Sequence, residues 1–147
     1  MFTRAQELGL VTGMKPITRH VLAKSVGMLA LLDAAVKGYA KVRYVIAFGG
    51  REVSSNPGYA AYTIANGAMW SALQFANRHT KLGCYFLELP LVEGSTMAAQ
   101  YLADRNTDKS RVGDAISPSD IARVILEILA DKRDPKERVV LKPDWTA

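Results

Sequence analysis

The sequence is poor in the residues that build several common kinds of site. It has one cysteine, Cys84, among 147 residues, which excludes an internal disulfide and a cysteine-based metal cluster. A single cysteine also fits a reducing compartment, so a cytoplasmic protein is expected. The two histidines, His20 and His79, are too isolated to form a metal pair, and each is interpreted as an ordinary helix-surface residue. No metal site is therefore predicted.

Long apolar runs and blocks of like charge are also missing. No apolar stretch approaches the ~18 residues that span a bilayer, and the first residues have no apolar signal core, so we expect neither membrane insertion nor secretion. The formal charge is +5, but the basic residues are scattered, so a nucleic-acid partner is not indicated. Hydrophobic residues make up 49% and charged residues 22%, which is the balance of one globular domain.

Glycine is present, but not in the arrangement that binds a dinucleotide. A complete nucleotide-binding α/β domain begins with a strand, a Gly-rich turn and a helix whose N-terminus holds the pyrophosphate. Gly49 and Gly50 follow an apolar run, yet the next residues are Arg-Glu-Val-Ser, with no third glycine at the required spacing. The sequence also has no P-loop, paired-histidine zinc motif or nucleophile elbow.

The hydrophobic pattern predicts three main helices. Apolar residues recur at spacings of three and four over 17–37, the second helix covers 60–79, and the third opens at a capping box, Ser117-Pro-Ser-Asp120. Gly38 is expected to end the first helix. Gly67 lies inside the second, where it suggests close approach of a backbone or ligand, or is simply tolerated. The residues expected to face the core are Val21, Leu22, Met28, Leu29, Leu32 and Val36 in the first helix, and Ile121, Val124, Ile125 and Ile128 in the third.

Three short apolar runs alternate with these helices and predict strands. They are residues 43–48, 84–91 and 138–142, of which the first two are expected to be buried on both faces. The alternation predicts an α/β fold, namely a partial Rossmann-like parallel sheet of about three strands without the N-terminal nucleotide-binding half. The first strand would then present an open edge, which invites pairing with another chain.

The segments between these elements complete the predicted organisation. Residues 1–16 are expected to form an irregular lead-in, and 17–147 a half domain. A loop is predicted over 51–58, which is rich in Ser, Asn, Pro and Gly. Residues 92–114 are long enough for a short helix on a mobile lid.

Four stretches, in order, carry a family likeness. The segment Val21-Leu-Ala-Lys24-Ser-Val-Gly27 precedes Tyr44-Val-Ile-Ala-Phe-Gly-Gly-Arg51, and Tyr62-x-x-x-Asn66 follows an Asn-Pro-Gly turn. The last stretch is Val139-Val-Leu-Lys-Pro-Asp-Trp145. Together they resemble the C-terminal, catalytic-side half of the ketoreductase domains of polyketide synthases, in the short-chain dehydrogenase/reductase superfamily. Most of that superfamily has Tyr-x-x-x-Lys, whereas these ketoreductases have Tyr-x-x-x-Asn and a lysine on the preceding helix.

The resemblance implies NADPH-dependent reduction of a β-ketoacyl or other carbonyl group. It makes Tyr62 the proton donor, Lys24 the ammonium that stabilises the tyrosine anion, and Asn66 the residue that orders the relay. Residues 62 and 66 share one face of a helix, so their spacing fits a common site. Three alternatives stay open: Tyr62 as an interfacial aromatic, Lys24 as a solvated lysine, and Asn66 as a helix-surface residue.

Other positions follow the family less closely. Thirteen residues before the tyrosine, where the resemblance implies a catalytic serine at the substrate, this chain has Gly49. Pro90 matches the proline before the nicotinamide-contacting loop, so the resemblance implies cofactor contacts at Pro90, Leu91 and Val92. Met97 is a candidate for lining an apolar acyl channel, the alternative being a lid helix that packs on its own core.

The missing half defines the expected partners. The resemblance implies that NADP binds only when another chain supplies a nucleotide-binding half, and an acyl carrier protein is a further candidate partner. A homo-oligomer formed through the exposed sheet edge is the alternative assembly. Two functions are therefore kept: a ketoreductase-like catalytic half, and a catalytically degenerate subunit kept for assembly, which the glycine at position 49 favours.

Overall fold

The computed structural model describes residues 18–19, 21–38, 41–50, 60–103, 115–136 and 139–140. The predicted lead-in at 1–16 and the predicted loop at 51–58 lie outside these ranges. The elements, in chain order, are the π-helix η1 (Leu22–Val26), α3 (Gly27–Val36), β1 (Tyr44–Gly50), α4 (Ala60–His79), β2 (Gly83–Leu89), α5 (Thr96–Ala103), α6 (Pro118–Leu129) and β3 (Val139–Val140).

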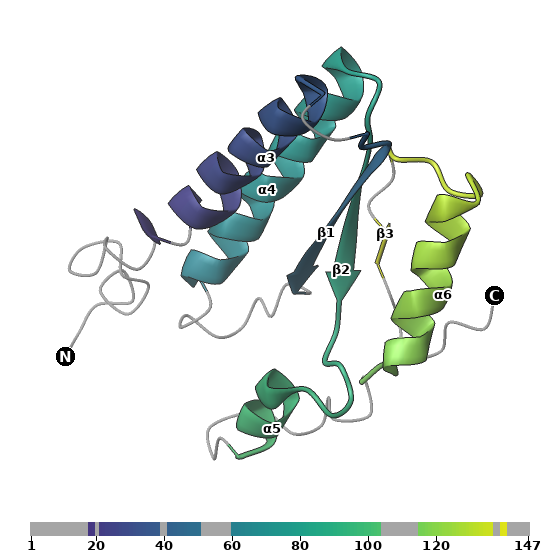
Figure 1. The fold of residues 1–147 in the computed structure, drawn as a ribbon. Helices are drawn as coiled ribbons and strands as arrows, with labels where there is room; N and C mark the ends of the chain where they lie inside the picture. Colours follow the sequence, from purple (N-terminus) through teal and green to yellow (C-terminus); the bar gives the residue numbers. More distant parts are fainter. Residues whose placement is uncertain are drawn as a thin grey trace.

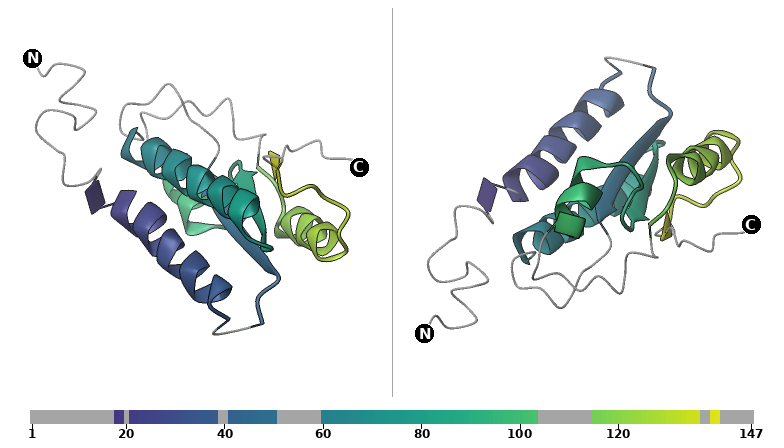
Figure 2. Two further views of the ribbon diagram at one scale, coloured as in Figure 1. Left: turned by 90° about the horizontal axis from the view of Figure 1, so that it is seen from above. Right: turned by 90° about the horizontal axis from the view of Figure 1, so that it is seen from below.

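The three strands form one parallel sheet in the order β1-β2-β3 (Figure 1). The helices α3 and α4 lie side by side over one face, and α6 covers the other (Figure 2). This arrangement confirms the predicted α/β fold with a small parallel sheet. Each consecutive strand is reached through a helix, as parallel pairing requires.

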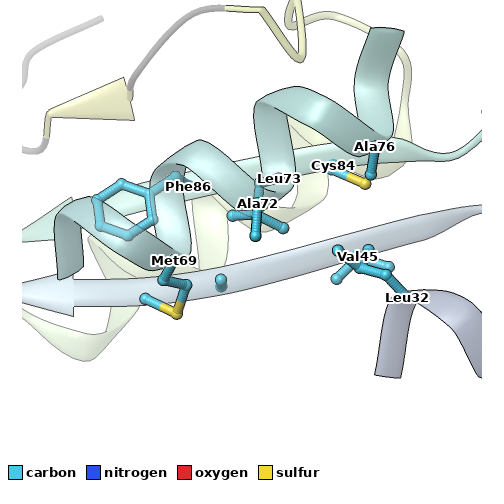
Figure 3. Packing of buried hydrophobic residues seen from close by; sticks show 9 residues of the cluster. Leu32, Val45, Met69, Ala72, Leu73, Ala76, Cys84 and Phe86 are labelled. Carbon is cyan, nitrogen blue, oxygen red and sulfur yellow. The ribbon is translucent and has the colours of Figure 1, made fainter. Parts of the chain in front are cut away.

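The core between the sheet and α4 is built from small and large side chains in alternation. Ala72 and Ala76 on α4 let the helix approach the sheet closely, and Leu73 and Phe86 fill the remaining space (Figure 3). Cys84 lies fully buried in this cluster, and its burial raises the pKa of its thiol to about 11. It is the free cysteine of the chain.

The opposite face of the sheet carries a second cluster under α6. Val124 and Ile128 are buried there, and Ile121 and Ile125 pack partly buried against them. The predicted buried face of this helix is therefore confirmed. The predicted capping box is confirmed as well: Ser117 accepts from the backbone N–H of Asp120, and the Asp120 carboxylate accepts from the backbone N–H of Ser117.

The first predicted helix differs from expectation in two ways. It contains a five-residue π-helical stretch at Leu22–Val26, and three of its six predicted core positions are exposed to solvent. Leu32 is buried and Met28 partly so, whereas Leu22, Leu29 and Val36 are each about half exposed. The prediction of a helix buried along one side was therefore wrong for these three, because the described part of the chain places only β1 and α4 against it. Gly38 follows the helix with a φ of +76°, as a helix-terminating glycine does.

The strands also correct the prediction at their ends. β1 starts one residue later than expected and includes Gly49 and Gly50, while β2 ends at Leu89, before Pro90. β2 is buried on both faces, as predicted. β1 is not, because Phe48, on the same face of the sheet as Tyr44 and Ile46, is 46% exposed.

A polar cluster ties the amino end of β1 to the end of α6. Asp131, which has a φ of +56°, accepts hydrogen bonds from Arg43 and from the Tyr44 hydroxyl. The hydrogen bond to Asp131 is the main reason that the pKa of Tyr44 is raised.

None of the helices in the described ranges has the length and apolar content that crossing a bilayer requires.

Candidate active site

The structure joins two of the predicted site residues by a direct contact. The Nζ atom of Lys24 donates a hydrogen bond to Oδ1 of Asn66, across 42 residues of sequence. Asn66 is only 3% exposed, and its Nδ2 donates to the carbonyl oxygen of Gly50 at 3.3 Å. The amide therefore connects the helix that carries the lysine to the carboxyl end of β1. Neither a solvated Lys24 nor a surface Asn66 describes this arrangement.

The π-helical stretch gives Lys24 its local setting. The backbone N–H of Gly27 donates to the carbonyl of Leu22, five residues back, and Ser25 Oγ donates to the carbonyl of Val21. Such wide turns change the direction of the side chains they contain and occur often at functional sites. No element of the sequence pattern predicted this turn.

Half-burial changes the acidity of the lysine. Desolvation disfavours the charged form, and the pKa of Lys24 is lowered from 10.5 for this reason. The hydrogen bond to the Asn66 oxygen satisfies one of the three ammonium donors. An ammonium that is partly desolvated and fixed in direction acts more strongly on a neighbouring anion than a solvated one does.

Tyr62 belongs to α4, one turn before Asn66. Positions four apart share a face of an α-helix, so its backbone is placed toward the same side as the buried amide. Its side chain lies outside the described residues. The structure thus brings Lys24 and Asn66 together and places the tyrosine backbone one turn away.

Gly49 is buried, and its neighbour Phe86 occupies the space in front of it. A Cβ atom at position 49 would lie 2.2 Å from Cζ and 2.9 Å from Cε2 of the Phe86 ring. The ring itself is held edge-on against Trp70, with the centroids 5.8 Å apart. The place where the resemblance implies a serine side chain is therefore filled by an aromatic edge.

The segment predicted to contact a cofactor lies at the same edge of the sheet. Gly50, which accepts from Asn66, is paired in register with Leu89, directly before Pro90. Leu91 and Val92 continue from there, and this stretch is bonded to Ile116, two residues before α6: Ile116 N donates to Leu91 O at 2.8 Å. All three predicted residues are partly buried.

Two further predictions concern α5 and the second helix. Met97 lies on α5, and its side chain is outside the described residues, so its predicted role at an acyl channel or within a lid stays a prediction. Gly67 has nothing within 4 Å of the position of a Cβ atom, so the described part of the chain makes no close approach there.

Glu88 is the residue that sequence reasoning missed. It is 6% exposed, lies near the end of β2 and pairs in register with Gly49. Alternation along the strand puts it on the same face as Cys84 and Phe86, toward α4. The signal was present in the sequence, because Glu88 is the one charged residue inside the apolar run 84–91.

Metal chemistry and relationships complete the description of the site. Across the ranges that the structure describes, no three His, Cys, Asp or Glu side chains are grouped to hold a metal ion. No family model, curated protein or solved structure matches this chain.

Proposed function

We propose that this chain is the catalytic-side half of a ketoreductase-like enzyme, which reduces a carbonyl group together with a nucleotide-binding half from another chain. The observation that carries the proposal is the hydrogen bond from Lys24 to Asn66. The sequence motif pairs these two residue types on successive helices, and contact between them is what a shared site requires.

The chain's own residues are suited to proton delivery and not to holding a dinucleotide. The sequence has no Gly-rich phosphate-binding turn, and the Leu91 carbonyl and the Glu93 N–H are already bonded to Ile116. The resemblance implies NADPH, which supplies hydride when bound, and the partner half is the part that would hold it.

Reduction of a carbonyl places negative charge on its oxygen, which must then receive a proton. In the proposal Tyr62 donates that proton from its hydroxyl to the substrate oxygen. The Lys24 ammonium lowers the free energy of the tyrosinate that remains, because opposite charges attract more strongly in a partly desolvated site. Asn66 fixes the ammonium, and its own bond to Gly50 fixes Asn66.

A second function has its own supporting observation. The Phe86 ring fills the position that the Cβ atom of a serine would take, and Gly49 itself offers the substrate oxygen no side-chain hydrogen-bond donor. Loss of one such donor costs on the order of 3 kcal/mol of transition-state stabilisation. This favours the alternative of a catalytically degenerate subunit that keeps the fold for assembly.

The two functions are separated by the effect of Tyr62→Phe. With the nucleotide-binding half of a polyketide synthase ketoreductase added, the wild-type chain is expected to reduce a β-ketoacyl thioester, followed by NADPH absorbance. Tyr62→Phe is expected to lower the rate at least a hundredfold, because only the proton-donating hydroxyl is removed. Lys24→Met is expected to lower it as well.

Tyr44→Phe is the matched control, because Tyr44 lies at the amino end of β1 and bonds Asp131. It should leave the rate unchanged. A rate unaffected by Tyr62→Phe would remove Tyr62 from the mechanism, and no turnover by any mixture would favour the degenerate subunit.

A further inference from the structure

One flank of α3 carries exposed apolar side chains that nothing in the described chain covers. Leu29 and Val36 are seven residues apart and share one side of the helix, and they are 48% and 54% exposed. Leu22 and Val26 extend the apolar surface into η1 and are exposed to a similar degree. Apolar residues at helical spacing normally mark a buried face, so this surface has the pattern of a core without its counterpart.

The direction of this flank follows from the buried residues beside it. Leu32 faces the core and contacts the cluster that includes Val45 of β1. On one side of Leu32 lie Met28 and, one turn earlier, Lys24, which reaches Asn66 on α4. By helical spacing, Leu29 and Val36 lie on the other side of Leu32 from Met28 and Lys24. The flank therefore faces the space beyond β1.

The strand β1 is open on the same side of the molecule. Within the described ranges it pairs with β2 alone, so its outer backbone groups have no strand partner there. Natural edge strands are usually protected by charges, proline or bulges, yet Tyr44–Gly50 contains no charged residue and no proline. Its composition is that of an inner strand.

We propose that the outer side of β1 and the Leu29–Val36 flank of α3 form one docking surface, here called the open edge. Its occupant is a parallel strand of another chain, lying beside β1 with apolar side chains against Leu29 and Val36. This inference rests on the proposed function, because it identifies that chain as the nucleotide-binding half. A parallel strand keeps all carboxyl strand ends at one edge, beside Gly50 and Asn66, and ligands bind at that edge in open α/β sheets.

The size of the surface fits a specific interface. Leu22, Val26, Leu29 and Val36, with Val42 and Phe48 at β1, are between 36% and 54% exposed. These six residues supply apolar contact area toward the ~800 Å² that each partner contributes to a standard interface. The backbone groups of β1 add hydrogen bonds to this area.

A second copy of the chain fits the open edge poorly. Two-fold pairing of β1 with itself would place the two strands about 4.8 Å apart. The α3 helices of the two copies would then lie over two strands that are only about 4.8 Å apart. Packed helices need ~8–10 Å between their axes, so the two helices would collide. A partner that brings a strand without a helix at that place has no such conflict.

The test compares Leu29→Glu with Leu126→Glu, which places the same charge at a 65% exposed leucine of α6, on the far side of the sheet. The probe is the separately expressed nucleotide-binding half of a polyketide synthase ketoreductase, and complex formation is measured by light scattering after size exclusion. Leu29→Glu is expected to weaken the complex at least tenfold, and Leu126→Glu to leave it unchanged. Circular dichroism confirms that both variants fold.

Hydrogen exchange supplies a second measurement, with protection of the β1 amides expected in the wild-type complex. The inference is overturned if no complex forms, if Leu29→Glu binds like the wild type, or if the chain alone forms a dimer that Leu29→Glu dissociates. A complex that forms through the open edge but reduces no carbonyl group contradicts the proposed function and leaves the docking surface standing.

Discussion

At the scale of single residues, the contact between Gly49 and Phe86 decides most about the chemistry. Position 49 has no room for a side chain, because the ring edge of Phe86 lies where a Cβ atom would be. The ring cannot turn away freely, since it is fully buried and packs against Trp70. A serine introduced at position 49 would therefore disturb the packing of the core, whatever its effect on catalysis.

Gly49→Ser is accordingly expected to lower the free energy of unfolding by about 1–3 kcal/mol, the usual range for an overpacked core. Urea denaturation measures this change. Gly67→Ala is the control, because nothing lies within 4 Å of its Cβ position, and it should raise the stability by up to ~1 kcal/mol through helix propensity. A Gly49→Ser variant as stable as the wild type would contradict the crowding.

At the scale of elements, α6 begins at a cap that its own sequence supplies. Ser117 and Asp120 satisfy each other's backbone N–H groups, and Pro118 stands in the first turn, where its missing N–H costs nothing. Val124 and Ile128 then attach the helix to the sheet. The cap and the buried face act together, so α6 should be sensitive to its first residue.

Ser117→Ala is expected to lower the free energy of unfolding by ~1 kcal/mol, because the N–H of Asp120 loses its side-chain acceptor. Ser71→Ala makes the same chemical change at an exposed site inside α4, where Ser71 Oγ only bonds the Gly67 carbonyl. That control should change the stability by less than ~0.5 kcal/mol. Equal effects of the two substitutions in thermal unfolding would argue against the capping role.

At the scale of the whole molecule, the described fold is a three-stranded sheet with helices on both faces, in which β1 is the longer of the two edge strands. α6 and β3 close the far side, whereas β1 ends the sheet with an apolar strand under an exposed helix flank. A dinucleotide needs a Gly-rich turn that this chain does not have. In the proposed function, the nucleotide-binding half therefore supplies the cofactor site.

The isolated chain is accordingly expected to show no micromolar binding of NADPH in isothermal titration calorimetry. Addition of the nucleotide-binding half should restore NADPH binding. The control is the same titration of the nucleotide-binding half alone, which measures how much NADPH it binds without this chain. Micromolar affinity of the isolated chain would contradict the prediction and would mean that residues outside the recognised motifs hold the cofactor.

The sequence predicted the site in part. The resemblance implies that Tyr62, Lys24 and Asn66 share one site, and of these the structure shows Lys24 and Asn66 in contact, whereas helical spacing alone left both as ordinary surface residues. The π-helical turn around Lys24 could not be predicted, because it depends on backbone hydrogen bonds that leave no pattern in composition. Glu88 stands out in the sequence as the one charged residue within 84–91. Its burial could not be predicted, because a charge at this position also fits the end of a strand.

By itself the sequence determined the helices, the strands and the capping box, because periodicity, turn residues and capping are local and act within a few residues. Only the tertiary structure decided which apolar faces are covered, that Lys24 reaches Asn66, and that Phe86 closes the space at Gly49. Those outcomes depend on neighbours tens of residues away. The same spacing that made Leu29 and Val36 look like core residues leaves them exposed, because burial requires a second surface, and the described chain does not supply it.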